Sequence, residues 1–111
     1  MHDIVKNMAE VFKALGDPTR LRIIRMLASG MENSLCVADL AQRLGITQPA
    51  VSQHIKVLKN LSILEPNREG FRVFYNINTD VLADYKTMID ELFKLAFEKC
   101  ANYGKCQGHG G

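Results

Sequence analysis

The chain has 111 residues, of which 47% are apolar and 23% charged, with 14 Lys and Arg residues against 12 Asp and Glu residues. This length fits one small globular domain, and the composition argues against disorder or a fibrous repeat. The apolar runs are far shorter than the ~20 residues that span a bilayer, and the start MHDIVKNMAEVF is too polar for a signal peptide. The sequence therefore predicts a soluble, cytoplasmic protein without a membrane partner.

Two helices are expected at the beginning of the chain. The first is indicated by apolar residues at helical spacing, and Gly16 ends it. Asp17 and Pro18 then begin a second helix, because an acidic N-cap and a proline at the first helical position both favour initiation. This helix ends near Ser29 and Gly30. The residues expected to be buried are Met8, Val11, Phe12 and Leu15 in the first helix, and Leu21, Ile24, Leu27 and Ala28 in the second.

A helix-turn-helix follows. Residues 37–44 predict a short third helix that Gly45 ends, and Thr47 caps a fourth helix whose first turn tolerates Pro49. Only residues 45–47 separate the two helices, and a short turn containing glycine is typical of a helix-turn-helix. The buried stripe of the fourth helix is expected to be Val51, Ile55 and Leu58.

After Leu61 the pattern changes from helical to extended. Residues 63–66 predict a short strand, residues 67–70 a turn, and residues 71–77 a second strand, so a β-hairpin directly follows the fourth helix. A fifth helix with a long apolar face is expected from Thr79 to about Ala101. Residues 1–103 then form one domain, and residues 104–111, with four of the eight glycines, form a flexible tail.

The fourth helix and the hairpin have the composition of a surface that reads DNA. Residues 47–72 carry a net charge of +2, against +1 for residues 1–46 and −1 for residues 73–111. Glutamine can bond adenine through two contacts, and recognition helices read the major groove mainly with their N-terminal residues. The alternative is an ordinary solvated helix face beside a surface hairpin. The candidate DNA contacts are Thr47, Gln48, Ser52, Gln53, His54, Lys56, Lys59, Arg68 and Arg72.

Four ordered segments resemble the ArsR/SmtB repressors: LGDPTRLRII from Leu15, LCVADLA from Leu35, QPAVSQHIKVL from Gln48 and REGFRVFY from Arg68. The resemblance covers roughly residues 8–97. It implies a mainly α winged helix-turn-helix, with five helices plus the hairpin as wing, that forms a homodimer. Such a repressor binds double-stranded operator DNA without a cofactor, represses its own operon, and leaves the DNA when an inducer binds.

The resemblance also implies that the fifth helix forms half of the dimer interface, paired with the first helix. Its apolar face fits this role, and the alternative is that the face forms part of a core within one chain. The residues assigned to the interface are Leu82, Tyr85, Ile89, Leu92, Phe93 and Ala96.

Two inducer sites of the family can be compared with this chain. One has two cysteines separated by one residue near the start of the third helix, where this chain has Cys36 but Ala38 in place of the second thiol. The other binds zinc with Asp and His residues of the fifth helix, and residues 79–101 contain no His, which excludes it.

Three cysteines remain as candidate ligands: Cys36, Cys100 and Cys106. An odd count without signs of export argues against a disulfide framework. Soft thiolates suit As(III), Sb(III), Cd(II) or Pb(II), and some arsenic-sensing members of the family have clustered C-terminal cysteines. Cys36 from either subunit, solvent or His109 would supply the third ligand.

Several alternatives stay open at this point. Cys100 and Cys106 could instead form a redox or reactive-sulfur sensor, or all three thiols could be incidental. An enzyme is not indicated, because the sequence has no phosphate-binding loop and suggests no Cys–His pair. A protein-interaction module is a further alternative, and DNA affinity that falls steeply with salt would favour DNA binding over it.

Overall fold

The computed structural model describes residues 4–29 and 35–103, and the tail expected at residues 104–111 lies outside these ranges. The described chain forms five helices and a three-stranded antiparallel sheet in the order β1-β3-β2. The elements are α1 (Ile4–Leu15), α2 (Pro18–Ser29), β1 (Leu35–Cys36), α3 (Val37–Leu44), α4 (Gln48–Asn60), β2 (Leu64–Glu69), β3 (Arg72–Ile77) and α5 (Thr79–Tyr103). The five expected helices and the wing are confirmed.

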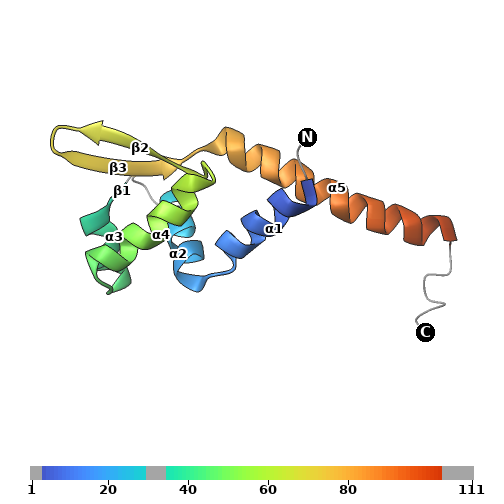
Figure 1. Ribbon diagram of the computed structural model, residues 1–111, viewed down its shortest axis with the longest axis horizontal. Coiled ribbons are helices and arrows are strands. Elements are labelled where there is room, and N and C mark those ends of the chain that lie inside the picture. Colours follow the sequence, from blue (N-terminus) through green and yellow to red (C-terminus); the bar gives the residue numbers. More distant parts are fainter. Residues whose placement is uncertain (1–3, 30–34, 104–111) are drawn as a thin grey trace.

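The molecule is elongated, with extents of 59 × 31 × 25 Å. Helices α2, α3 and α4 and the sheet form a rounded body, from which α5 extends away, with α1 lying beside its first half (Figure 1). The tip of the β2–β3 hairpin and the α3–α4 turn therefore lie at the end of the molecule opposite to the end of α5.

Local hydrogen bonds explain where the helices begin and end. The Asp17 carboxylate accepts the backbone N–H groups of Thr19 (2.8 Å) and Arg20 (3.1 Å), which caps α2. Gly45 has the left-handed conformation (φ 70°) that ends α3, and Thr47 Oγ1 accepts the N–H of Ala50 (3.2 Å) at the start of α4. The three-residue turn between α3 and α4 is thus fixed at both of its ends.

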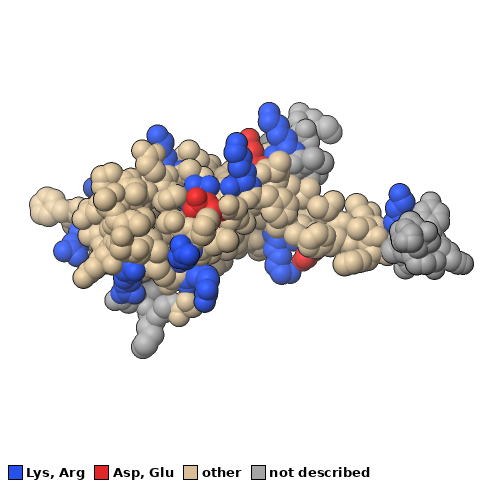
Figure 2. Space-filling view, turned by 90° about the horizontal axis from the view of Figure 1, so that it is seen from below, with Lys and Arg blue, Asp and Glu red and all other residues tan. Residues whose placement is uncertain are grey.

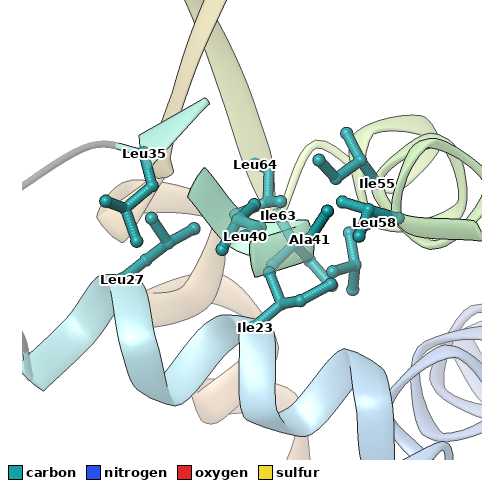
Figure 3. Packing of buried hydrophobic residues seen from close by; sticks show 10 residues of the cluster. Ile23, Leu27, Leu35, Leu40, Ala41, Ile55, Leu58, Ile63 and Leu64 are labelled. Carbon is teal, nitrogen blue, oxygen red and sulfur yellow. The ribbon is translucent and has the colours of Figure 1, made fainter. Parts of the chain in front are cut away.

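One small core joins the helix-turn-helix to the base of the hairpin. Side chains from α2, α3, α4, β1 and the Ile63–Leu64 segment converge there (Figure 3). Ile63 follows Ser62, which has a positive φ of 59°, and the Ile63 amide donates to the carbonyl of Leu58 (3.0 Å). The hairpin consequently begins directly on the end of α4. The buried cluster comprises Ile23, Leu27, Leu35, Leu40, Ala41, Val51, Ile55, Leu58, Ile63 and Leu64.

The expected buried faces of the first two helices are partly wrong. Leu21 is 46% exposed and Ala28 is exposed, whereas Ile23 is completely buried together with Leu27. Because positions 21, 23 and 24 are all apolar, the sequence allows two phases of the stripe, and contact with α3 and α4 selects Ile23. Phe12 is likewise 46% exposed.

The strands also differ from the expectation. β2 begins at Leu64 and continues through Glu69, so the residues of turn-like composition belong to a strand. Only Gly70 and Phe71 form the turn, since Glu69 pairs directly with Arg72. The short strand β1 was not expected at all, and it pairs with β3 through Leu35 opposite Tyr75 and Cys36 opposite Phe74. Two residues are too few to produce a β pattern in the sequence.

Candidate nucleic-acid interface

The first half of α4 presents polar side chains to solvent. Val51, Ile55 and Leu58 are buried on one side of the helix, which fixes its rotation and turns Ser52 and Gln53 outward. Both are exposed, and so is Gln48 in the first turn of the helix. Their amide and hydroxyl groups offer both donors and acceptors, as reading base edges requires. The Thr47 hydroxyl is also exposed but already serves as the N-cap of α4.

A groove of about 320 Å³ runs between α4 and the sheet. Ser52, Lys56 and Lys59 line its α4 side, and Tyr75 of β3 lines the other. Both lysines are exposed, so their ammonium groups are available to phosphates. Figure 2 shows Lys and Arg side chains on several sides of the rounded body, with acidic groups sparse on that face.

The hairpin adds two exposed cations beside this helix. Arg68 lies opposite Val73 in the β2–β3 register, and Arg72 lies opposite Glu69, one position nearer the tip. Both arginines are exposed. The ribbon that carries them ends at the same end of the molecule as the α3–α4 turn (Figure 1). In this register Arg68 and Arg72 belong to opposite faces of the ribbon, so the wing carries one exposed cation on each face.

His54 has a different environment from its neighbours on α4. It is half-buried, its Nδ1 lies 3.2 Å from Nη1 of Arg20, and the same nitrogen lies 4.0 Å from the Asp17 carboxylate. Arg20 also donates to the backbone carbonyls of Ala14 and Lys13 at the end of α1. His54 therefore holds α4 against α2 instead of standing in the exposed row with Gln53.

Arg20 and Asp17 are the residues of this network that the sequence did not reveal. Hydrogen bonds from the amides of Arg20 and then Thr19, with the charges of Arg20 and His54, hold the pKa of Asp17 below its ordinary value of 3.8. The only signal in the sequence was the N-cap position of Asp17. Nothing in the local pattern indicates that Arg20 reaches both the end of α1 and the middle of α4.

Cys36 is buried and makes a hydrogen bond to a carboxylate. Its Sγ donates to Oδ2 of Asp39 (3.1 Å), and its backbone N–H donates to the same oxygen (3.2 Å). These two bonds, followed by the charges of Arg72 and Arg43, lower the pKa of Asp39 from its ordinary value of 3.8. Cys36 is therefore a structural partner of Asp39 in this conformation.

The other candidate ligands are less completely described. Cys100 belongs to α5, although its side chain is outside the described set, and Cys106 and His109 lie outside the described residues altogether. Within one chain, the structure does not bring Cys36 to the last turn of α5, because these lie at opposite ends of the molecule (Figure 1). Among the described residues, no three His, Cys, Asp or Glu side chains form a group that could hold a metal ion.

The apolar face of α5 is divided between two environments. Leu82 packs on the core, the Tyr85 hydroxyl donates to the carbonyl of Leu61 (2.8 Å), and Ile89 lies against Met8 and Val11 of α1. The second half of the helix is open to solvent on this face, with Leu92 43% and Phe93 53% exposed and Ala96 exposed.

In the described ranges, no helix has both the length and the apolarity needed to cross a membrane.

Comparison with known proteins identifies transcriptional regulators as relatives of this chain. The model of the family described as "Bacterial regulatory protein, arsR family" matches residues 17–65. An uncharacterised HTH-type transcriptional regulator of Methanocaldococcus jannaschii is 40% identical over 84 residues, which cover 76% of this chain and 92% of that protein. The arsenical resistance operon repressor of Escherichia coli is 34% identical over 90 residues, covering 81% and 75% respectively.

A solved structure supports the same relationship. The homodimeric winged helix-turn-helix DNA-binding domain of a possible ArsR-family regulator from Mycobacterium bovis is 28% identical to this chain. It superposes with a TM-score of 0.63 and covers 86% of this chain, which in turn covers 82% of that domain.

The Asp39 carboxylate makes stability depend on pH in a definite direction. The pKa of Asp39 in the folded protein lies below 3.8. Its contribution to the free energy of unfolding is therefore complete above pH 3.8 and disappears as the pH falls through the lowered pKa. Asp39→Asn should therefore be less stable than the wild type at neutral pH, with a difference that closes in strongly acidic buffer. Urea unfolding at fixed protein concentration across this pH range measures the difference.

The matched control is Asp90→Asn, which removes an exposed carboxylate that pairs with Lys86 at 2.8 Å. Exposed pairs of this kind contribute little, so its stability should follow the wild type at every pH. A difference between Asp39→Asn and the wild type that stays constant with pH would contradict the assigned role of the carboxylate.

Proposed function

The chain belongs to the ArsR family of bacterial transcriptional regulators, which are not enzymes, and from this premise we propose that it is a dimeric repressor released from its operator by a soft metal or metalloid ion. The observation that carries the proposal is the exposed polar row of α4, Gln48, Ser52 and Gln53, beside a groove with two lysines. A buried apolar stripe on the opposite side of α4 holds this row outward.

In the proposed complex, the first half of α4 lies in the major groove. Gln53 and Gln48 bond base edges, whereas Lys56 and Lys59 bind phosphates along the groove between α4 and the sheet. Arg68 and Arg72, on opposite faces of the wing, bind the phosphates on either side of it. Two such surfaces related by a two-fold axis read a roughly palindromic operator, with half-sites about one helical turn apart.

The proposed dimer forms through the open half of α5 together with α1. Tyr85 and Ile89 are already occupied within the chain, so the second copy would pack mainly on Leu92, Phe93 and Ala96. Phe12 on α1 is a further exposed apolar side chain that pairing would cover. Leu82 contributes by anchoring the start of α5 to the core.

The proposed inducer site is the pair Cys100 and Cys106, with As(III) as the leading ion and Sb(III), Cd(II) or Pb(II) as chemically similar ones. The Escherichia coli relative named for arsenical resistance supports a metalloid. Cys36 ranks below this pair, because its thiol proton is engaged by Asp39 and an ion would have to displace that bond. Solvent, His109 or Cys36 of a second copy would complete the coordination.

We expect Gln53→Ala and Arg72→Ala to weaken DNA binding in different ways. Loss of a base contact by Gln53 should cost about 1–3 kcal/mol on the preferred sequence and relax the preference at one position. Loss of a phosphate contact by Arg72 should lower the affinity for all sequences similarly. It should also reduce by about one the slope of log affinity against log salt concentration. Fluorescence anisotropy titrations on specific and random duplexes at several salt concentrations separate these patterns. Identical behaviour of the two variants would refute the assignment.

The dimer interface is tested by placing a charge on the open face of α5. Leu92→Glu should give a monomer or an aggregate, because burial of a leucine contributes ~1.5–3 kcal/mol per chain. Thr87→Glu adds the same charge at an exposed position on the opposite side of α5 and should remain dimeric. Sedimentation velocity distinguishes these states, and a folded dimer of Leu92→Glu would count against the interface.

The inducer site is tested with a double variant, Cys100→Ser/Cys106→Ser. It should bind DNA as the wild type does but no longer release it on addition of As(III), because a serine hydroxyl is a poor ligand for a soft ion. Cys36→Ser should keep a weakened response. Full release of the double variant by As(III) would exclude the C-terminal pair, whereas a wild type that responds to peroxide and not to As(III) would indicate redox sensing.

A further inference from the structure

The tip of the wing carries a fully exposed aromatic side chain, Phe71. The other exposed aromatic residues of the described chain are Phe12 on α1 and Phe93 and Phe97 on α5, on the two helices proposed to form the dimer. Phe71 is at the other end of the molecule, in the turn between β2 and β3 (Figure 1). The proposed dimer therefore gives this side chain no partner.

The turn that presents Phe71 is tight and defined. Glu69 and Arg72 pair directly, so Gly70 and Phe71 are its only central residues. Gly70 has a positive φ of 64°, and the only non-glycine residue with a positive φ in the described ranges is Ser62. A positive φ confined to a glycine at the first central position is the pattern of a type II′ hairpin. Phe71 thus stands on a regular ribbon instead of a loose loop.

The length of the hairpin places Phe71 well beyond the core. Leu64 at the base of β2 is 1% exposed, and Glu69 is five residues further along the strand. At ~3.3 Å per residue, the tip reaches about 16 Å beyond the buried base. Major and minor grooves alternate across each phosphate strand. With α4 in a major groove, a ribbon of this reach extends over the phosphates to the adjacent minor groove.

We propose that Phe71 enters this minor groove beside each half-site and acts as an apolar wedge that partly unstacks one base step. Arg68 and Arg72, exposed on the same ribbon, bind the phosphates on either side and offset the cost of approaching them. Apolar side chains that enter the minor groove commonly kink DNA in this way. The inference rests on the proposed function, since it requires α4 to read the neighbouring major groove.

Phe71 would select DNA by how easily its base steps unstack, which hydrogen bonds to base edges cannot do. A phenyl ring has no donor or acceptor for base edges, and the minor groove distinguishes little more than A·T from G·C pairs. The wedge instead selects steps that unstack easily, above all the flexible TA and CA/TG steps. The preferred operator should consequently contain such a step at a fixed distance outside each major-groove half-site.

The experiment uses the full-length protein and a duplex that the wild type has selected from a random-sequence pool. The adenines flanking the half-sites are replaced one at a time by 2-aminopurine, whose fluorescence rises when its base unstacks. The wild type should raise the signal severalfold at one flanking step per half-site. Phe71→Ala, added at saturating concentration, should abolish that rise and bind about tenfold more weakly, as expected when a buried aromatic side chain is lost.

Two further variants serve as controls. Phe71→Leu keeps an apolar side chain at the tip and should retain most of the fluorescence change. Asn67→Ala alters an exposed position of β2 away from the tip and should change neither fluorescence nor affinity. Because Phe71 is fully exposed and Asn67 is exposed, all three variants should unfold at the temperature of the wild type.

The outcomes separate the inference from the function on which it rests. Equal fluorescence from the wild type and Phe71→Ala on the same duplex shows that Phe71 does not unstack a base step, whatever the affinities. The exposed side chain would then be assigned to contact with a protein partner instead. A wild type that selects no sequence from the pool overturns the proposed function, and the wedge with it.

Discussion

The packing of α4 against a single small core is the constraint on which the rest of the structure depends. Ile55 and Leu58 of α4 meet Ile23 of α2 and Leu40 of α3 in that core, and the chain turns at Ser62 straight into the hairpin. The rotation of α4 and the position of the wing are therefore set by the same contacts. A DNA-reading surface made of a helix and a ribbon needs this coupling, because both elements must keep a fixed position relative to each other.

The small size of the chain explains why the two halves of α5 differ in burial, and the cysteines lie in different parts of the fold. A chain of 111 residues buries too little surface to enclose every apolar face, so the second half of α5 stays open while its first half completes the fold. Cys36 lies in the body, where its thiol donates a hydrogen bond to Asp39, whereas Cys100 belongs to the last turn of α5. An ion bound near that end would therefore lie closer to the proposed dimer interface than to the proposed DNA-reading surface.

Much of this fold could be predicted from the sequence, because its signals are local. Asp17, Gly45 and Thr47 occupy the caps that their side chains or backbone freedom favour, and the α4 stripe follows from periodicity. What escaped prediction depends on contacts between distant segments. The choice of Ile23 over Leu21 requires α3, strand β1 exists only because β3 lies beside it, and the contact between Arg20 and His54 joins residues 34 positions apart.

Hydroxyl-radical footprinting of the wild type on its selected duplex shows most directly whether two copies read DNA together through α4. We expect two protected segments related by a two-fold axis, with centres about 10–10.5 base pairs or a multiple of that distance apart. Both should disappear together as salt is raised, because phosphate contacts supply much of the affinity. A single protected segment, or protection that does not depend on salt, would exclude binding by two copies through α4 and phosphate contacts.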